Sequence, residues 1–191
     1  MTERLHFEPL AHQYKLLPSG VVLPSVSEVI RPLVDFSRVP PATLEAARAR
    51  GVAVHKGCEL FDLGTLDEDD LDERLVPYVR AWAQFMYDWK PTWTEIETPG
   101  YHKTLLYAGT PDRRGKWEKK RILVDTKATY ALSPAVQVQL SGYDLMGDQP
   151  CDELWSVRLL KTGEYVRTVH PAAHSTFLSC LNILRWQQKN A

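Results

Sequence analysis

Two carboxylates and a lysine near the middle of the chain could together carry out metal-assisted chemistry on a phosphate. Asp112 ends the segment Tyr-Ala-Gly-Thr-Pro-Asp, and Asp125 and Lys127 end a second run, Ile-Leu-Val-Asp-Thr-Lys. Carboxylates bind Mg²⁺ through oxygen, and the cation polarises a phosphoryl group and lowers the pKa of its bound water. A nearby ammonium can stabilise the negative charge that develops. The two segments therefore predict a site that holds a hard divalent cation against a phosphate.

Strand periodicity predicts how these groups are positioned. Successive residues of a strand point to opposite faces, so Asp125 and Lys127 share one face and Thr126 points the other way. A hairpin through the charged residues 113–120 would place Asp112 beside Asp125. The local excess of positive charge in and around this hairpin could bind phosphates without reading sequence, and Trp117 could stack on a base. The alternative is an exposed polar hairpin tip.

These motifs resemble the PD-(D/E)XK nuclease superfamily, in particular its RecB-like exonuclease branch. That family has an acid after a glycine-containing strand, here Gly109 to Asp112, and then (D/E)xK on the next strand, here residues 125–127. His55, in Arg-Gly-Val-Ala-Val-His, is similar to the helix histidine that joins the metal shell in this branch. The resemblance runs from about Gly51 to Tyr143, in the expected order.

Two further motifs of the same branch are matched. Glu97 resembles the acid of the preceding strand, although Glu95 alternates onto the same face and is the alternative. Gln139 and Tyr143 resemble the QxxxY helix motif, and their i,i+4 spacing puts them on one helix face. Many relatives carry Thr directly after the catalytic lysine, whereas this chain has Ala128.

The resemblance implies a role for each matched residue. The expected metal ligands are His55, Asp112, Asp125 and the Thr126 carbonyl; the expected catalytic residues are Asp112, Asp125, Lys127 and Glu97; the expected DNA-binding residues are Gln139, Tyr143, Arg113 and Arg114. Lys127 would activate the attacking water, and Glu97 would orient water or a second ion. Gln139 and Tyr143 would position the strand.

The implied activity is that of a metal-dependent DNA exonuclease that uses Mg²⁺ or Mn²⁺ on single- or double-stranded ends. Stand-alone relatives of this size act in phage or prophage recombination, repair or DNA processing, so a recombination protein is an expected partner. An endonuclease that nicks DNA or selects a structure is the first alternative, and a non-catalytic DNA-binding module the second. Fold alone does not decide among them. Cys58, Cys151 and Cys180 fall outside the four-cysteine arrangement of some relatives, so we expect no iron-sulfur cluster.

The elements around these motifs predict an α/β fold with a mixed central β-sheet flanked by helices, the restriction-endonuclease-like PD-(D/E)XK core. A hairpin over residues 14–23 and a short helix, capped by Ser25 with Glu28 three residues on, precede two long helices that begin near Pro40 and Leu71. Strands are predicted at 92–98, 105–110 and 121–126, then a helix at 133–146, a hairpin at 154–169 and a last helix at 171–185.

Length and composition fit a single soluble domain. The 191 residues are 44% hydrophobic and 25% charged, with a formal charge of −1. We expect one nuclease domain over 1–191, with an N-terminal hairpin and short helix in 1–40 and the nuclease core in 41–191. No apolar run approaches the roughly 20 residues that span a bilayer, and the start lacks the apolar centre of a signal peptide. We therefore expect no membrane association and a cytoplasmic location in a bacterial or phage-infected cell.

Overall fold

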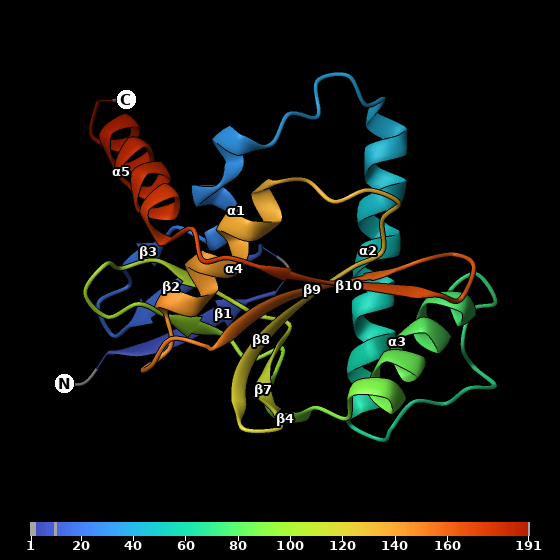
Figure 1. The fold of residues 1–191 in the computed structure, drawn as a ribbon. Helices are drawn as coiled ribbons and strands as arrows, with labels where there is room; N and C mark the ends of the chain where they lie inside the picture. Colours follow the sequence, from blue (N-terminus) through green and yellow to red (C-terminus); the bar gives the residue numbers. More distant parts are fainter. Residues whose placement is uncertain (1–2, 10, 191) are drawn as a thin grey trace.

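A five-stranded mixed sheet forms the centre of the molecule (Figure 1). The computed structural model describes residues 3–9 and 11–190. The sheet has the order β10-β9-β8-β7-β4, made of β4 (Thr92–Ile96), β7 (Arg113–Trp117), β8 (Lys120–Lys127), β9 (Glu153–Leu159) and β10 (Tyr165–His170). β8 and β9 are parallel, and the other neighbours are antiparallel. The predicted fold class, a mixed sheet flanked by helices, is confirmed.

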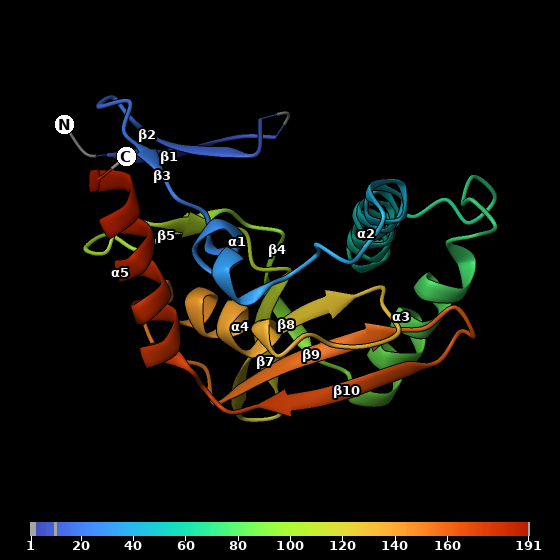
Figure 2. The same ribbon diagram turned by 90° about the horizontal axis from the view of Figure 1, so that it is seen from above.

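Helices cover both faces of this sheet. They are α1 (Val26–Val29), α2 (Pro41–Asp62), α3 (Val76–Trp89), α4 (Ala135–Leu145) and α5 (His174–Asn190), with a short 3-10 turn η1 (Arg31–Leu33) after α1. Residues of α2 and α3 pack with one set of sheet side chains, and residues of α1, α4 and α5 pack with the other. Figure 2 shows the two groups on opposite sides of the molecule. Among the described residues, no helix has both the length and the apolar character needed to cross a bilayer.

The alternation along β8 directs its residues to these two layers. Ile122 and Val124 are buried against α2 and α3, whereas Leu123 is buried against α4. Because the period is two, Thr126 continues the α2 side, and Asp125 and Lys127 continue the α4 side. The polar end of β8 therefore presents groups to both layers at once.

Two small sheets are separate from the central one. The first has the order β1-β2-β3, made of β1 (Arg4–Glu8), β2 (Gln13–Leu17) and β3 (Val22–Leu23), and the second pairs β5 (Gly100–Tyr101) with β6 (Ala108–Gly109). The glycine turn of the predicted hairpin is present, since Gly20 has a φ of 74°. β1 was not predicted. Ser25 caps α1 as expected, because its hydroxyl accepts a hydrogen bond from the Glu28 amide at 3.0 Å.

Two predicted segments differ from the structure. The run 105–110 forms only the short β6, because Leu106 adopts a φ of 44° and turns the chain just before it. The charged residues after Asp112 are mostly strand, since β7 occupies 113–117 and the turn is confined to Glu118 and Lys119. Charged side chains do not prevent a strand whose backbone is paired on both sides, as that of β7 is.

Candidate active site

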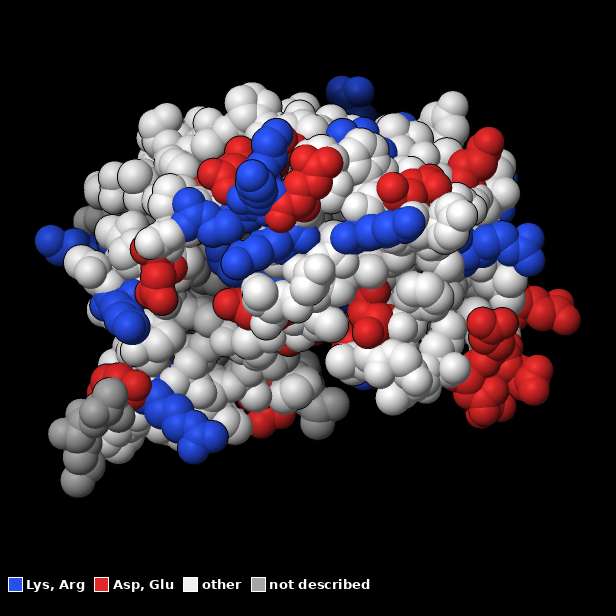
Figure 3. All heavy atoms as spheres, turned by 60° about the horizontal axis from the view of Figure 1, so that its bottom comes forward, with Lys and Arg blue, Asp and Glu red and all other residues white. Residues whose placement is uncertain are grey.

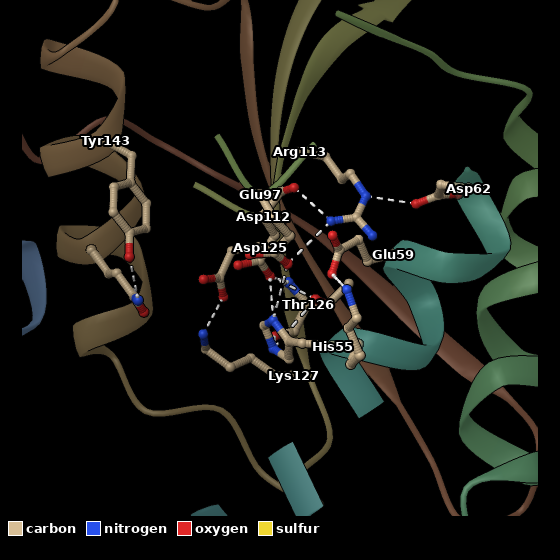
Figure 4. A network of polar contacts seen from close by, with 12 residues as sticks. His55, Glu59, Asp62, Glu97, Asp112, Arg113, Asp125, Thr126, Lys127 and Tyr143 are labelled. Atoms are coloured by element: carbon tan, nitrogen blue, oxygen red, sulfur yellow. Dashed lines mark hydrogen bonds and ion pairs between the residues drawn. The ribbon is translucent and has the colours of Figure 1, made fainter. Parts of the chain in front are cut away.

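The predicted polar residues converge where β8 ends, between α2 and α4 (Figure 4). Arg113 pairs with Val124 across the β7–β8 hairpin, so the preceding residue, Asp112, comes to lie beside Asp125. The Asp112 carboxylate accepts hydrogen bonds from the Thr126 amide and the Thr126 hydroxyl, each at 2.6 Å. Hairpin register therefore fixes the first acid against the second strand, as the sequence predicted.

His55 of α2, Glu97 and Asp112 form a three-residue cluster. His55 Nδ1 lies 3.4 Å from Asp112 Oδ2 and 3.6 Å from Glu97 Oε1. One potential ligand atom from each residue lies within 4.8 Å of the others, so the three could hold a metal ion. Glu97 follows β4 with a φ of 45°, and its amide donates to the Asp112 carbonyl at 2.9 Å. Glu95, the alternative acid, instead pairs with Arg114 at 3.3 Å.

The tautomer of His55 follows from its second contact. His55 Nε2 lies 3.0 Å from the Thr126 carbonyl oxygen, which can only accept a hydrogen bond. Nε2 therefore carries a proton, and Nδ1 is the nitrogen that faces the two carboxylates. The Thr126 carbonyl was predicted as a metal ligand. In this structure it accepts a hydrogen bond from His55 and so orients the ring, as backbone carbonyls commonly do for metal-binding imidazoles. Its role as a ligand stays a prediction.

Asp125 and Lys127 occupy the α4 side of the site. The Lys127 ammonium lies 2.6 Å from Asp125 Oδ2, which confirms that the two side chains share a face. Asp125 is 1% exposed, and apart from this ion pair neither carboxylate oxygen receives a hydrogen bond from the described residues. Asp125 is not part of the three-residue cluster. A buried carboxylate with so few donors has free capacity for a cation.

Gln139 and Tyr143 of α4 line the same cavity as the acids. The Gln139 amide donates to the Tyr143 hydroxyl at 3.3 Å, as the i,i+4 spacing predicted. Gly109 of β6 allows the Tyr143 ring to lie close to the backbone, because a Cβ built at Gly109 would lie 2.6 Å from a Tyr143 ring carbon. The glycine of the Gly-Thr-Pro-Asp motif thus makes room for the tyrosine of the QxxxY motif.

The carboxylates shift one another's proton affinity. Burial alone would lower the pKa of His55, but the charges of Asp112 and Glu97 outweigh it and raise that pKa to about 9. Burial raises the pKa of Asp125 to about 6, with Lys127 opposing the shift and Asp112 adding to it. For Asp112 burial would raise the pKa, yet His55 and Lys127 hold it below its ordinary value. The site thus concentrates negative charge that is only partly compensated by its own cations.

Arg113 is buried and cannot contact a strand in the cavity, so the prediction that it binds DNA is wrong. Its side chain is 1% exposed, and its guanidinium bonds Asp62 at 2.6 Å and Glu97 at 3.2 Å (Figure 4). A third bond, at 2.6 Å, reaches the Asp112 carbonyl. Arg113 therefore positions two of the site acids. Sequence reasoning missed this role and Asp62, because the two partners lie 51 residues apart.

Arg114 points to the other face of β7 and is also engaged within the fold. It donates to the Tyr143 carbonyl at 2.9 Å and pairs with Glu95. Its side chain is 14% exposed. Its predicted contact with DNA does not fit this position, because the guanidinium packs against the C-terminal half of α4.

The basic hairpin tip is remote from the acids, which fits the alternative of an exposed polar tip rather than phosphate binding beside the site. Lys120 begins β8 and Lys127 ends it, a separation of roughly 23 Å at about 3.3 Å per residue. Figure 3 brings this end of the sheet forward and shows lysines and arginines interspersed with carboxylates. Trp117, which was considered as a residue that could stack on a base, packs against Trp89 and Trp155.

A cavity of about 560 Å³ opens onto the acids. Its lining includes Asp112, Asp125, Lys127 and His55, together with side chains of α4 and of the β1–β2 hairpin. Oxygen donors from carboxylates suit Mg²⁺ and Mn²⁺, and an imidazole nitrogen is a common additional ligand. The residues present therefore fit a divalent cation held by His55, Glu97 and Asp112, with Asp125 adjoining.

Fold and site together define an α/β protein with a carboxylate, histidine and lysine centre at one end of its sheet. A scan against protein-family models and a search of curated proteins find no match. Among solved structures, similarity is found to an alkaline exonuclease from Laribacter hongkongensis. The identity is 13%, the TM-score is 0.44, and the match covers 88% of this chain and 95% of that chain.

Proposed function

We propose that this protein is a divalent-metal-dependent deoxyribonuclease that hydrolyses phosphodiester bonds at DNA ends. The observation that carries the proposal is the convergence of Asp112, Asp125 and Glu97 with Lys127 in one cavity, from segments that are separate in sequence. Buried carboxylates cost free energy unless they are compensated, so such a cluster is typical of a functional site. A cation bound there would neutralise phosphate charge and make a water more acidic.

The chain's own residues supply the remaining chemistry. The Lys127 ammonium, held by Asp125, would donate to the attacking water or to the oxygen on which charge develops. His55 and Glu97, held by the Thr126 carbonyl and Arg113 respectively, would keep the ligand atoms in place. Gln139 and Tyr143 would hydrogen-bond the strand.

The shape of the cavity favours a strand end over an intact duplex. Its volume is that of a small-molecule site. The major groove of B-DNA alone is about 12 Å wide, so a duplex would lie across the mouth of a cavity of this size rather than inside it. A frayed or single-stranded end would enter it, and this supports exonuclease rather than endonuclease action.

End-labelled single- and double-stranded oligonucleotides, incubated with Mg²⁺, Mn²⁺ or EDTA, test the activity. We expect shortening of the labelled strand with either metal and none with EDTA. Asp125→Asn should lose at least about a hundredfold in rate, whereas Asp148→Asn, an exposed acid outside the cavity, should retain it. Covalently closed circular DNA should resist, and its linearisation would favour the endonuclease. An Asp125→Asn protein with full activity would refute the mechanism.

A further inference from the structure

The N-terminal hairpin forms one wall of the cavity that holds the acids. Phe7 of β1, Pro9 and His12 of the following turn, and Tyr14 of β2 all line it. In Figure 2 the β1–β2 hairpin and α2 lie apart from each other. Val52 of α2, 73% exposed, also lines the cavity. The hairpin wall is therefore mostly aromatic and apolar, whereas α2 also contributes the charged Lys56 and Glu59, and the floor is charged.

The three rings of this wall are graded from buried to exposed. Phe7 pairs with Tyr14 across the two strands, and their rings stack with centroids 4.6 Å apart and planes 25° apart. His12 meets both rings edge-on, at 5.4 Å from Phe7 and 5.7 Å from Tyr14. Tyr14 is buried, Phe7 is half-buried and His12 is exposed. Aromatic surface of Phe7 and His12 thus remains exposed next to the buried Tyr14 ring.

The wall is joined directly to the acidic floor. The Tyr14 hydroxyl and the Thr110 hydroxyl lie 2.9 Å apart and share a hydrogen bond. Thr110 stands two residues before Asp112, in the segment that places the first acid. A group that contacts Phe7 or His12 is therefore held at a fixed position relative to the phosphate-binding floor.

We propose that Phe7 and His12 form a stacking subsite for a nucleobase of an unpaired DNA strand whose phosphate lies at the acids. Every base presents a π face, so aromatic side chains bind single strands with little sequence preference. Bases inside a duplex are already stacked and paired, so this wall selects unpaired nucleotides. The subsite rests on the proposed nuclease function for the placement of the phosphate, and it names the substrate class as single-stranded or frayed DNA.

The hairpin's own packing is the competing explanation for Phe7. Its ring adjoins the small core of Tyr14, Leu16 and Leu23. Phe7→Leu keeps an apolar side chain there while it removes the aromatic face. His12→Ala changes an exposed residue, and His6→Ala is a matched control, because His6 is exposed on β1 and does not line the cavity.

Binding of a single-stranded oligonucleotide carrying one 2-aminopurine, in Ca²⁺ buffer without Mg²⁺ or Mn²⁺, tests the subsite. Stacking quenches 2-aminopurine fluorescence, so we expect quenching by the wild-type protein when the probe is near the strand end. Phe7→Leu combined with His12→Ala should weaken binding about tenfold or more and relieve the quenching. His6→Ala should match wild type. An oligonucleotide of abasic residues should bind wild type and the double variant equally.

Four outcomes separate this subsite from the nuclease proposal. Base-dependent quenching that the double variant loses supports the subsite, even if the wild-type protein cleaves no DNA with Mg²⁺ or Mn²⁺. Cleavage by wild type together with unchanged binding by the double variant overturns the subsite and leaves the nuclease standing. Equal loss of affinity for base-containing and abasic strands also overturns it, since the hairpin would then act through the backbone. Equal quenching by a blunt duplex overturns the preference for unpaired strands.

Discussion

Both ends of β8 carry ion pairs between basic side chains and carboxylates, but the pairs at one end are exposed and the pair at the other is buried. At the first end, Lys120 and Arg121 lie at the surface and pair with carboxylates at the start of β9, the neighbouring strand. At the other end, Asp125 is buried and Lys127 mostly so, and their neighbours come from α2, α4 and the segment before β7. The first set is held by β9 and the few residues that precede it, whereas the second is assembled from four parts of the chain.

This difference shows why charge density is a poor guide to the site. The basic tip is the more conspicuous feature of the sequence, yet its side chains are solvated, and exposed pairs contribute little. The acids are fewer, but burial makes each of them costly without a compensating partner or ligand. The contrast can be tested by making matched substitutions at the two ends.

The largest expected effect is on stability, from Arg113→Met. This change leaves Asp62 buried without the guanidinium that lies 2.6 Å from it. Loss of one partner of a buried pair typically costs about 3–5 kcal/mol in the free energy of unfolding. Arg121→Met, which removes an exposed pair with Asp152, should cost less than about 1 kcal/mol. Urea unfolding followed by circular dichroism measures both, and equal costs would contradict the contrast.

The next effect is on rate, from Lys127→Met against Lys120→Met in the same strand. Removal of a positioned charge from the transition state typically lowers the rate about 10²–10³-fold, so we expect that loss for Lys127→Met. Lys120→Met should stay within about twofold, because the tip is remote from the acids. Single-turnover cleavage of an end-labelled oligonucleotide gives the ratio. Comparable losses in the two variants would place the tip in the reaction.

The smallest effect is a pH dependence at the tip. Its hydrogen bond to the Lys120 ammonium holds the pKa of Glu153 below its ordinary value. A depressed native pKa stabilises the fold above the unfolded pKa of about 4.3, and this stability is lost as pH falls through the native value. Wild type should therefore lose up to about 1 kcal/mol more than Glu153→Gln between pH 6 and pH 3. Urea midpoints at both pH values measure this, and parallel losses would show that the pair contributes nothing.

Local patterns predicted most of the fold and the composition of the site. Alternation in 121–126, the capping box at Ser25 and the i,i+4 pair in α4 all concern neighbours in sequence. Such signals arise from strand and helix geometry, which sequence spacing reveals. His55, Glu97 and Asp112 were predicted to meet, and they do. Their roles in catalysis stay predictions.

Long-range pairings could not be predicted in the same way. Arg113 follows Asp112 in a run of basic residues and looks like part of the solvated hairpin. Its burial depends on Asp62 at the end of α2, and no local signal joins the two. β1 was missed for a different reason, since its residues Arg-Leu-His-Phe-Glu do alternate polar and apolar side chains as a strand does. This local signal was present and was not used, and β1 pairs with β2 along its whole length.

The parallel pairing of β8 with β9 has a consequence for how the cleft could be altered. Parallel neighbouring strands need a crossover connection. The chain therefore leaves the sheet after Lys127 and returns along α4 to the edge where β9 begins. Residues 128–134 thus tether the acid-bearing strand to the helix that carries Tyr143. Insertions or deletions in this tether would widen or narrow the cleft while every strand keeps its partner. Residues 128–134 are therefore the segment to change in order to alter how deeply a DNA strand enters the cleft.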